Sequence, residues 1–361
     1  MDARIDTDVA IIGGGPAGSA TAITCAARGL RVHLFEHATF AGAGFADDRP
    51  GETLHPGVEP VLAQLGVADD LDAVVGARHD GIWIDWGGVR RFQSFGSDAN
   101  GPWRGFQVSR AAFDTMLLDR ARALGATIVQ PCRALGLRFE GERVTGILTE
   151  IGELSARFVV DATGRSHWIA RRLQINQPAR SPRLIARYGY ARGSCPRRDA
   201  APALVGDRNG WVWTARVGPS LYQWIRVTAI DERPDAAWLP DELGGLEPLG
   251  PSRGADVTWR IADRVTSSGW FMVGDAAAVL DPTSSHGVLK AMLSGIAAAH
   301  LIDGVIAGTL PPTSAAATYQ SWLNGWFAND AAHLSAFYRD IGMRGFGAPA
   351  SSERTMTTEQ S

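Results

Sequence analysis

Lysine is almost absent from this sequence. Lys290 is the only one among 361 residues, so nearly all of the positive charge comes from arginine. The net charge of -3 gives no reason to expect a nucleic acid or an anionic membrane as a partner. Cysteine is also scarce, and Cys25, Cys132 and Cys195 are scattered singly. This pattern excludes a disulfide framework and a cysteine metal cluster, and no metal site is expected.

The sequence also lacks segments that would direct the chain to a membrane or span one. No apolar run is long enough to span a bilayer, and residues 1–4 lack the features of a signal peptide. A cytoplasmic protein is therefore expected. Hydrophobic residues make up 45% of the chain and charged residues 20%, as in ordinary soluble proteins, and the length predicts two lobes rather than one core.

The strongest motif lies near the start of the chain. Residues 9–12 are apolar enough for a strand covered on both faces, and Gly13, Gly15 and Gly18 follow in the spacing of a dinucleotide-binding turn. The first glycine allows the turn, the second lets the backbone approach a pyrophosphate, and the third lets the next helix, residues 17–28, pack on the strand. The N–H groups and positive end of that helix would face the pyrophosphate.

Glu36 supports this interpretation. It ends a predicted strand at residues 31–35, about twenty residues beyond the glycines, where a carboxylate can accept hydrogen bonds from a ribose 2′-hydroxyl. Its charge argues against a cofactor that carries a 2′-phosphate. The alternative is that Gly29 only caps the helix and that Glu36 is a solvated side chain.

Residues 49–57 place ionisable side chains between turn-forming residues. Arg49, Glu52 and His55 stand among prolines and glycines, a density that favours a fixed loop beside a ligand. A plain surface connection is the alternative.

Two later strands are predicted to end in polar turns. Residues 158–161 form a buried strand that ends at Asp161, and residues 269–273 form another that is followed by Gly274 and Asp275. An aspartate at such a strand end is expected to face a ligand.

A loop at residues 281–287 leads into a long alanine-rich helix, residues 288–303. The N-terminus of this helix offers free N–H groups and a positive dipole end, which suit a ligand group on which negative charge collects. His286 is either a helix cap or a proton carrier, and the pattern does not decide between them.

Aromatic residues gather in the stretch 175–260. Residues 210–217 and 221–227 are predicted to form a hairpin, and the period of two puts Trp211 and Trp213 on one face. Together with Trp224 they would form a pocket for a flat, electron-rich substrate, although aromatic side chains also fill ordinary cores.

Three stretches resemble, in this order, the FAD fingerprints of the single-component flavoprotein monooxygenase superfamily. They are the glycines at 13–18, Asp161 to Ser166 followed by Arg171, and Gly274-Asp275. The superfamily also includes flavin-dependent halogenases and geranylgeranyl-reductase-like enzymes, and the resemblance spans most of residues 1–305. It implies an α/β fold in which a Rossmann-like FAD-binding domain of the glutathione-reductase type is interleaved with an antiparallel β-sheet substrate domain and followed by a C-terminal helix. FAD would be bound non-covalently.

The resemblance also implies domain boundaries and cofactor contacts. The FAD-binding domain is expected at residues 1–80, 106–172 and 262–310, the substrate-binding sheet at 81–105 and 173–261, a C-terminal helical segment at 311–344 and a disordered tail at 345–361. Contacts with FAD are expected from Gly13, Gly15, Pro16, Ala17, Gly18, Glu36, Arg49, Arg110, Ala134, Asp161, Gly164, Gly274, Asp275, Pro282, Ser285, Gly287 and Val288. Arg49 would neutralise charge that develops on the flavin.

Trp211 and Trp213 resemble the Trp-x-Trp pair of flavin-dependent halogenases, but the chain departs from that family twice. Halogenases continue Trp-x-Trp-x-Ile-Pro and keep a lysine in the substrate tunnel, whereas this chain continues differently and has its only lysine in the helix that follows the loop at residues 281–287. These differences argue against halogenation. The stretches at 51–54, 210–216 and 285–291 more closely resemble flavoproteins that modify tryptophan during maturation of quinone-cofactor enzymes. Those are the maturation proteins of lysine oxidase, glycine oxidase and quinohemoprotein amine dehydrogenase.

The expected activity is hydroxylation of an indole ring through a flavin hydroperoxide, on a tryptophan side chain of a peptide or protein. Glu52, His55 and His286 are the candidates for moving protons near the ring. A hydroxylase of a free small aromatic metabolite, a flavin-dependent halogenase and a double-bond reductase are the alternatives. The glycine motif occurs once, so NADPH, NADH or a separate flavin reductase remains open as the electron source.

Overall fold

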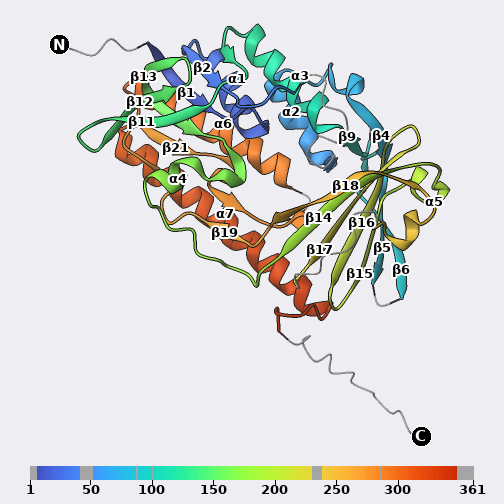
Figure 1. Ribbon diagram of the computed structural model, residues 1–361. Coiled ribbons are helices and arrows are strands. Elements are labelled where there is room, and N and C mark those ends of the chain that lie inside the picture. The colour runs from blue at the N-terminus through green and yellow to red at the C-terminus, as the bar shows by residue number, and fades with distance from the viewer. Residues whose placement is uncertain are drawn as a thin grey trace, which may run out of the picture.

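The computed structural model describes residues 6–40, 52–86, 88–99, 101–229, 238–284 and 286–347. Arg49, Ser285 and residues 348–361 of the predicted tail lie outside these ranges. Figure 1 shows two parts, one in which helices pack on a largely parallel sheet around the N-terminal strand, and one built on long antiparallel strands.

The first sheet is built around β1 (Thr7–Ile12), which has a parallel neighbour on each side. The order of the sheet is β10 (Thr127–Val129), β2 (Val32–Phe35), β1, β13 (Gly152–Asp161), β12 (Arg143–Thr149) and β11 (Ala134–Glu140), and β21 (Trp270–Met272) pairs with β13 and with β20 (Thr266–Ser267). The first half of β13 pairs antiparallel with β12, and its second half pairs parallel with β1 and β21. The carboxyl ends of β1, β13 and β21 therefore meet at one edge.

Several helices accompany this sheet. They are α1 (Pro16–Ala27), α2 (Glu59–Leu65), α3 (Arg110–Ala123), α4 (Trp168–Arg172) and α6 (Gly287–Ile306). The two longest apolar helices, α1 and α6, meet at a glycine, because a Cβ atom on Gly295 would lie 2.3 Å from the carbonyl oxygen of Ala17. By length and composition α6 could cross a membrane, contrary to the expectation that no run is long enough. Its close packing on α1 is that of a core helix.

The second sheet lies within the residues expected to bind substrate. Its order is β18 (Glu247–Asp256), β14 (Ile185–Arg192), β17 (Leu221–Thr228), β16 (Gly210–Gly218), β15 (Ala203–Asp207), β5 (Gly81–Trp86) and β6 (Val89–Ser94). All neighbours are antiparallel except β15 and β5. The hairpin predicted at 210–227 is confirmed as β16 and β17. A short helix, α5 (Pro196–Asp199), packs on β16.

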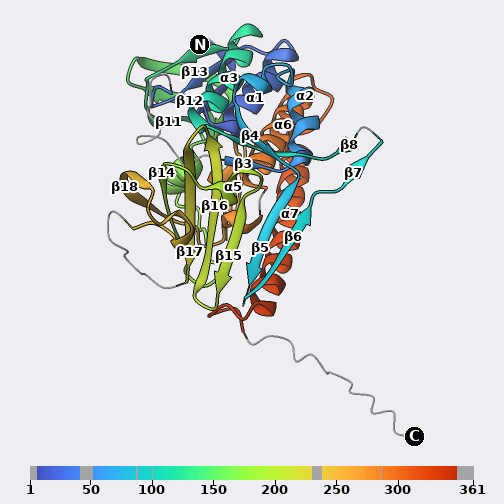
Figure 2. The same cartoon turned by 90° about the vertical axis from the view of Figure 1, so that its right-hand side faces the viewer.

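A small three-stranded sheet joins the two parts. It consists of β3 (Glu52–Leu54), β9 (Gly105–Val108) and β4 (Val75–His79), and β4 and β9 both contact β16. Two further strand pairs are short, namely β7 (Ser97–Asp98) with β8 (Gly101–Pro102) and β19 (Arg260–Ile261) with β22 (Ala278–Val279). Figure 2 shows the β7–β8 hairpin projecting from the body of the molecule.

The C-terminal helix α7 (Pro312–Asp340) ties the two large sheets together (Figure 1). Near its start the hydroxyl of Tyr319 donates to the carbonyl of Met272 in β21 at 2.8 Å. Near its end Tyr338 accepts a hydrogen bond from the indole nitrogen of Trp211 in β16 at 3.0 Å. The predicted C-terminal helix is thus a brace between the two parts.

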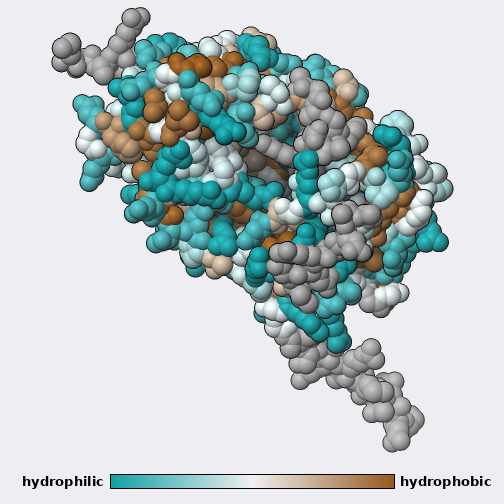
Figure 3. Space-filling model, viewed as in Figure 1, coloured by the Kyte–Doolittle hydropathy of each residue, from teal (hydrophilic) through white to brown (hydrophobic). Residues whose placement is uncertain are grey.

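The antiparallel side of the first sheet, at β11 and β12, carries exposed apolar side chains. Leu135, Phe139, Leu148 and Ile151 are all more than a third exposed. Figure 3 shows apolar surface over this β11–β13 edge. It lies away from the strand ends that carry the predicted motifs.

Candidate active site

The three polar turns predicted from the sequence meet at one edge of the first sheet. Ile12, Asp161 and Met272 stand side by side in register, so the turns that follow β1, β13 and β21 are neighbours. The third turn also touches α1, because a Cβ atom on Gly274 would lie 2.9 Å from that of Ala17. The carboxyl ends of adjacent parallel strands are where α/β sheets bind dinucleotides.

The glycine turn has no room for side chains. Gly13 has a φ of +105°, and a Cβ atom on it would lie 2.4 Å from the carbonyl oxygen of Ala162. A Cβ atom on Gly18 would lie 1.9 Å from the carbonyl oxygen of Gly13. Gly15 is the N-cap of α1 and Pro16 its first residue, and no side chain caps the helix. The turn therefore fits a pyrophosphate, which needs close approach and free backbone N–H groups.

Glu36 is buried beside this turn, and its carboxylate is held by neighbouring groups. Oε2 accepts from the backbone N–H of Gly14 at 2.7 Å, and Oε1 accepts from that of Ala38 at 3.0 Å and pairs with Nδ1 of His37 at 2.7 Å. Burial opposes ionisation, but these contacts outweigh it and hold the pKa of Glu36 below its ordinary value of 4.5. A contact with ribose stays a prediction.

Replacing Glu36 by glutamine is expected to lower the free energy of unfolding by about 1–2 kcal/mol at neutral pH. The folded-state pKa lies below the unfolded one, so ionised Glu36 stabilises the fold above the unfolded pKa. This stabilisation is lost as the pH falls through the folded-state pKa. In urea unfolding, the variant and the unmodified protein should differ at neutral pH and converge at a pH below the folded-state pKa of Glu36. An equal difference at both pH values would contradict the account.

Asp161 was expected to face a ligand, but its carboxylate faces its own chain. It is fully buried, accepts from the backbone and hydroxyl of Thr163 at 3.0 and 2.7 Å, and accepts from the backbone of Ile169 at 2.6 Å. Burial raises the pKa of Asp161, and these hydrogen bonds oppose the rise. The side chain therefore shapes the turn at Gly164 and the start of α4. Any contribution to cofactor binding from Asp161 would come through that turn.

Two other predicted cofactor residues stand at the starts of elements. Arg110 begins α3, and its guanidinium pairs with Asp114 through two contacts of 3.1 and 3.0 Å. Ala134 begins β11, and its carbonyl accepts from the indole nitrogen of Trp168 at 3.2 Å. Their contacts with FAD stay predictions.

The start of α6 is open. A Cβ atom on Gly287 would meet nothing within 4 Å, and the side chain of His286, the N-cap, makes no capping hydrogen bond. Val288, the next residue, is buried, whereas Asp275 and Pro282 in the adjoining turns are exposed. The residues present therefore fit the edge of a flavin ring, because the open helix end offers N–H groups and a positive dipole to it.

Two of the three predicted proton carriers lie together at this helix end. The ring centroids of His55 and His286 are 5.6 Å apart, and Nδ1 of His55 accepts the N–H of Gly57 at 3.1 Å. Burial lowers the pKa of His55, and burial together with nearby Lys290 and His55 lowers that of His286 to about 4. Both imidazoles are thus neutral at neutral pH. The side chain of Glu52 lies outside what the structure describes.

Trp213 is held against the small sheet. Its indole N–H donates to the hydroxyl of Thr53 at 3.0 Å, and that hydroxyl donates to Oε1 of Gln107 at 2.9 Å. The same oxygen accepts from Gln223 at 3.4 Å. One face of β16 and β17 therefore packs against β3, the strand that precedes His55. The indole of Trp213 lies on this face and forms an indole wall.

Trp224 does not belong to this wall, so the predicted pocket of three tryptophans is wrong in one member. In the register of β16 and β17, Trp213 lies opposite Ile225, and Trp224 lies opposite Thr214. Partners across a ladder share a face, so Trp224 points to the other side. There its ring lies 5.0 Å from that of Trp238.

Trp211 joins a buried hydrogen-bond network centred on Asp281, a residue that the sequence analysis did not single out. Tyr338 accepts from Trp211 and donates to Oδ1 of Asp281 at 2.9 Å. Oδ2 accepts from the indole nitrogen of Trp259 at 2.6 Å, and Oδ1 accepts from the backbone of Thr283 at 2.8 Å. Asp281 is fully buried, which raises its pKa against the effect of these hydrogen bonds. The network anchors the loop that precedes α6.

Comparison with known families indicates which cofactor the glycine turn at residues 13–18 binds. A family described as FAD binding domain matches residues 6–188, half of the chain. This chain belongs to that FAD-binding family. The flavoprotein is therefore an oxidoreductase-type enzyme, and the predicted fold class is confirmed.

Relatives of the flavoprotein include several halogenases. Tryptophan 2-halogenase of Chondromyces crocatus is 29% identical over 94% of this chain and 69% of its own length. The 1H-pyrrole-2-carbonyl-(peptidyl-carrier protein) brominase of Pseudoalteromonas luteoviolacea is 28% identical over 88% of this chain and 82% of its own length. Among solved structures, the myxobacterial chondrochloren halogenase CndH is 26% identical, with a TM-score of 0.82 over 96% of this chain and 87% of its own. These relatives correct the expectation that the maturation proteins of quinone-cofactor enzymes resemble the chain most closely.

The single lysine of the flavoprotein connects two helices, α6 and α7. Lys290 forms an ion pair with Asp330 of α7, and its Nζ lies 4.2 Å from the ring centroid of Trp326. Burial lowers the pKa of Lys290 to about 8. Its backbone N–H bonds the carbonyl of His286 at 2.9 Å, so the side chain leaves α6 one turn beyond the open end.

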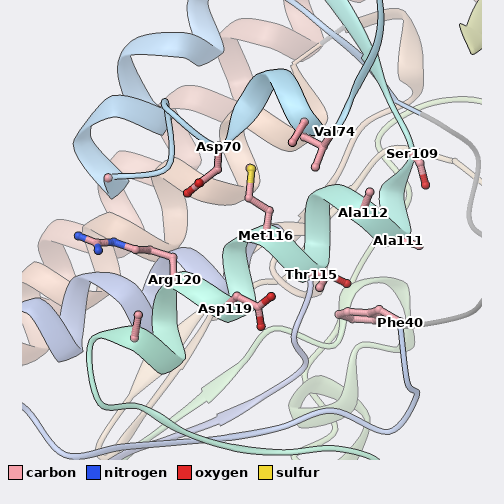
Figure 4. A pocket seen from close by; sticks show the side chains of 13 residues that line it. Phe40, Asp70, Val74, Ser109, Ala111, Ala112, Thr115, Met116, Asp119 and Arg120 are labelled. Atoms are coloured by element: carbon pink, nitrogen blue, oxygen red, sulfur yellow. The ribbon is translucent and has the colours of Figure 1, made fainter.

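A groove of about 760 Å³ lies elsewhere on the flavoprotein. Figure 4 shows Thr115, Met116 and Asp119 of α3 along one side of it, with Asp70 and Val74 across from them. None of the predicted site residues lines it, so this groove is not the candidate active site.

Proposed function

We propose that this flavoprotein is a halogenase that acts on an electron-rich aromatic ring. The observation that carries the proposal is the hydrogen bond of 3.0 Å between Trp213 and Thr53, which holds an indole wall next to His55 and the start of α6. Such a wall beside a flavin edge suits a flat aromatic substrate. The names of the relatives support this choice, since tryptophan and a carrier-bound pyrrole are both electron-rich aromatics.

The residues of the chain have distinct tasks in this reaction. Reduced FAD, when bound, would activate oxygen, and oxygen is the oxidant that turns halide into an electrophilic halogen species. The turn at residues 13–18 binds the pyrophosphate, and the N–H groups at the start of α6 stabilise negative charge at the flavin edge. Trp211 and Trp213 exclude water from the reacting ring. Because Nδ1 of His55 is an acceptor, its neutral imidazole carries the proton on Nε2, which can exchange it nearby.

Hydroxylation of the same kind of ring is the second candidate. The observation that favours it is the position of Lys290, which is paired with Asp330 rather than placed on the face of Trp213. Halogenases of the resembled family use a tunnel lysine, and this chain has no second lysine to provide it. A flavin hydroxylase needs no such amine.

Product analysis separates the two candidates. The purified protein is supplied with FAD, a flavin reductase with its nicotinamide, oxygen and bromide, and with indole or pyrrole substrates that are either free or part of a peptide. We expect a product that gains one bromine and that requires every component. A product that gains one oxygen instead would reject halogenation in favour of the second candidate. Unmodified substrate in the presence of FAD-loaded protein would reject both.

Replacement of Lys290 by methionine together with Asp330 by leucine is expected to change the bromination rate by less than about tenfold, or 1.4 kcal/mol in the barrier. The reason is that the amine is engaged by Asp330 and the ring of Trp326. The double variant avoids leaving Asp330 as an unpaired buried carboxylate. Initial rates of bromide incorporation measure the effect. A fall by several orders of magnitude, with FAD content unchanged, would show that this lysine handles the halogen.

A further inference from the structure

His79, the last residue of β4, is a buried histidine without a hydrogen bond. Its side chain is 4% exposed, and neither Nδ1 nor Nε2 has a partner among the residues that the structure describes. A neutral imidazole has one donor and one acceptor, so leaving both unused in the interior is costly unless a ligand meets them. The ring of His79 packs against Phe95, but this contact uses neither nitrogen of the imidazole.

The strand register puts His79 on the same side of the small sheet as the candidate site. Gly105 lies opposite His79, and Gln107, two residues further along β9, lies opposite Thr53. Paired residues share a face, as do residues two apart along a strand. Thr53 accepts the hydrogen bond of Trp213 on that face. His79 and the indole wall therefore border the same region between the sheets.

A row of rings links His79 to the flavin side of this region. The ring centroid of Phe95 lies 5.6 Å from that of His79 and 5.1 Å from that of His55, which in turn lies 5.6 Å from that of His286 at the start of α6. Gly105 makes room for the row, because a Cβ atom there would lie 2.8 Å from Nε2 of His79. The sequence therefore provides space for an imidazole that packs against Phe95 but forms no hydrogen bond with the residues that the structure describes.

We propose that His79 is the base that takes the ring proton from the aromatic substrate during substitution. This inference rests on the proposed halogenation and names a catalytic residue for it. The substrate would lie against Trp213, with the carbon to be substituted directed at the imidazole of His79.

The step balances without a further reactant. A ring carbon forms a bond to the halogen of hypohalous acid, the bond between oxygen and halogen breaks, and hydroxide leaves with the electron pair. The ring is now cationic and still carries a hydrogen on the substituted carbon. His79 accepts that proton, and the electrons of the C–H bond restore the aromatic ring. The imidazolium then protonates the hydroxide to give water.

The buried position of His79 suits this transfer. Desolvation lowers the pKa of His79 to about 4, and the charge of nearby Asp80 opposes this in part. The ring is thus neutral at neutral pH and has a free lone pair. Transfer of a proton from a cationic ring to a neutral imidazole leaves the buried charge unchanged, whereas a carboxylate base would have to be buried as an anion beforehand.

Replacement of His79 by asparagine tests the assignment. Loss of a general base is expected to lower kcat by a factor on the order of a hundred or more, with little change in KM. With a substrate deuterated at the reacting carbon, the unmodified protein should show no isotope effect on kcat, because proton loss is fast. The variant should show a normal isotope effect, because C–H cleavage becomes limiting. Loss of a purely structural residue would not create one.

Controls separate this role from damage to the fold. His33 of β2 is another histidine with an unpartnered buried nitrogen, and His33→Asn should leave kcat and the isotope effect unchanged. Added imidazole should restore part of the activity of His79→Ala. If His79→Asn fails to bind FAD, Gly105→Ala displaces the imidazole while retaining it, and the same isotope effect is expected. An active variant at His79 with unchanged kcat and no isotope effect would overturn the assignment, whereas absence of brominated product from the unmodified protein would overturn the proposed function instead.

Discussion

Replacement of Gly18 by alanine is expected to weaken FAD binding by about a hundredfold or more, a loss of at least 2.7 kcal/mol. The added Cβ atom would lie 1.9 Å from the carbonyl oxygen of Gly13, far inside van der Waals contact. The contact can be relieved only by moving α1 away from the turn. The N–H groups at the start of that helix would then no longer converge on the pyrophosphate. Titration of the FAD-free protein with FAD, followed by flavin fluorescence, measures the loss.

Gly325 of α7 provides the matched control. It is also a helical glycine, but a Cβ atom on it would meet nothing within 4 Å. Gly325→Ala should therefore leave FAD affinity unchanged and slightly raise stability, as alanine does in helices. If both alanine variants bound FAD as the unmodified protein does, the close approach at Gly18 would not be needed for the cofactor.

Replacement of Asp281 by alanine is expected to lower the free energy of unfolding by about 3 kcal/mol or more, because it leaves several buried donors without an acceptor. These donors are the indole nitrogen of Trp259, the hydroxyl of Tyr338 and the backbone N–H of Thr283. They belong to segments that are far apart in sequence. The loop before α6 should loosen with them, so FAD affinity is expected to fall as well. Urea unfolding gives the stability change.

Two variants calibrate this result. Tyr338→Phe keeps the carboxylate of Asp281 but removes one of its donors and leaves the indole nitrogen of Trp211 without its acceptor, so a loss of about 1–3 kcal/mol is expected. Asp263→Ala removes an exposed carboxylate and should change stability by less than about 0.5 kcal/mol. A loss at Asp281 no larger than that at Asp263 would show that the network does not hold the loop.

The parts of the site that the sequence could predict are those set by local pattern. The strand and the glycines at residues 13–18 follow one another directly, and the structure places them as predicted. The turn after β21 was predictable for the same reason, because a short apolar run ends there in polar residues. Parallel pairing then brings such turns together at one edge, whatever lies between them in sequence.

The parts that escaped prediction depend on register and on distant contacts. Period two correctly paired Trp211 with Trp213, but the face taken by Trp224 follows from the register across the hairpin, which alternation within one strand does not determine. The roles assigned to Asp281 and His79 depend on contacts with segments that are distant in the sequence. Neither was indicated by the sequence, except that Asp281 is the first residue of the predicted loop at 281–287.

The sequence shows directly that lysine is scarce, but it does not show what this scarcity means for the reaction. The absence of a second lysine argued against halogenation, whereas several relatives, one of them with a matching solved fold, are halogenases. Only the structure shows Lys290 paired with Asp330, and His79 without a hydrogen-bond partner among the described residues. Because of these two placements, we look for the reacting groups of this enzyme among residues other than lysine.

In the proposed site the flavin ring lies at the start of α6 and faces Trp213. A crystal structure of the complex with FAD tests it most directly. We expect the pyrophosphate at residues 13–18, and the flavin edge within about 2.7–3.2 Å of the backbone N–H groups that follow His286. A flavin ring bound elsewhere, such as in the groove along α3, would contradict the account.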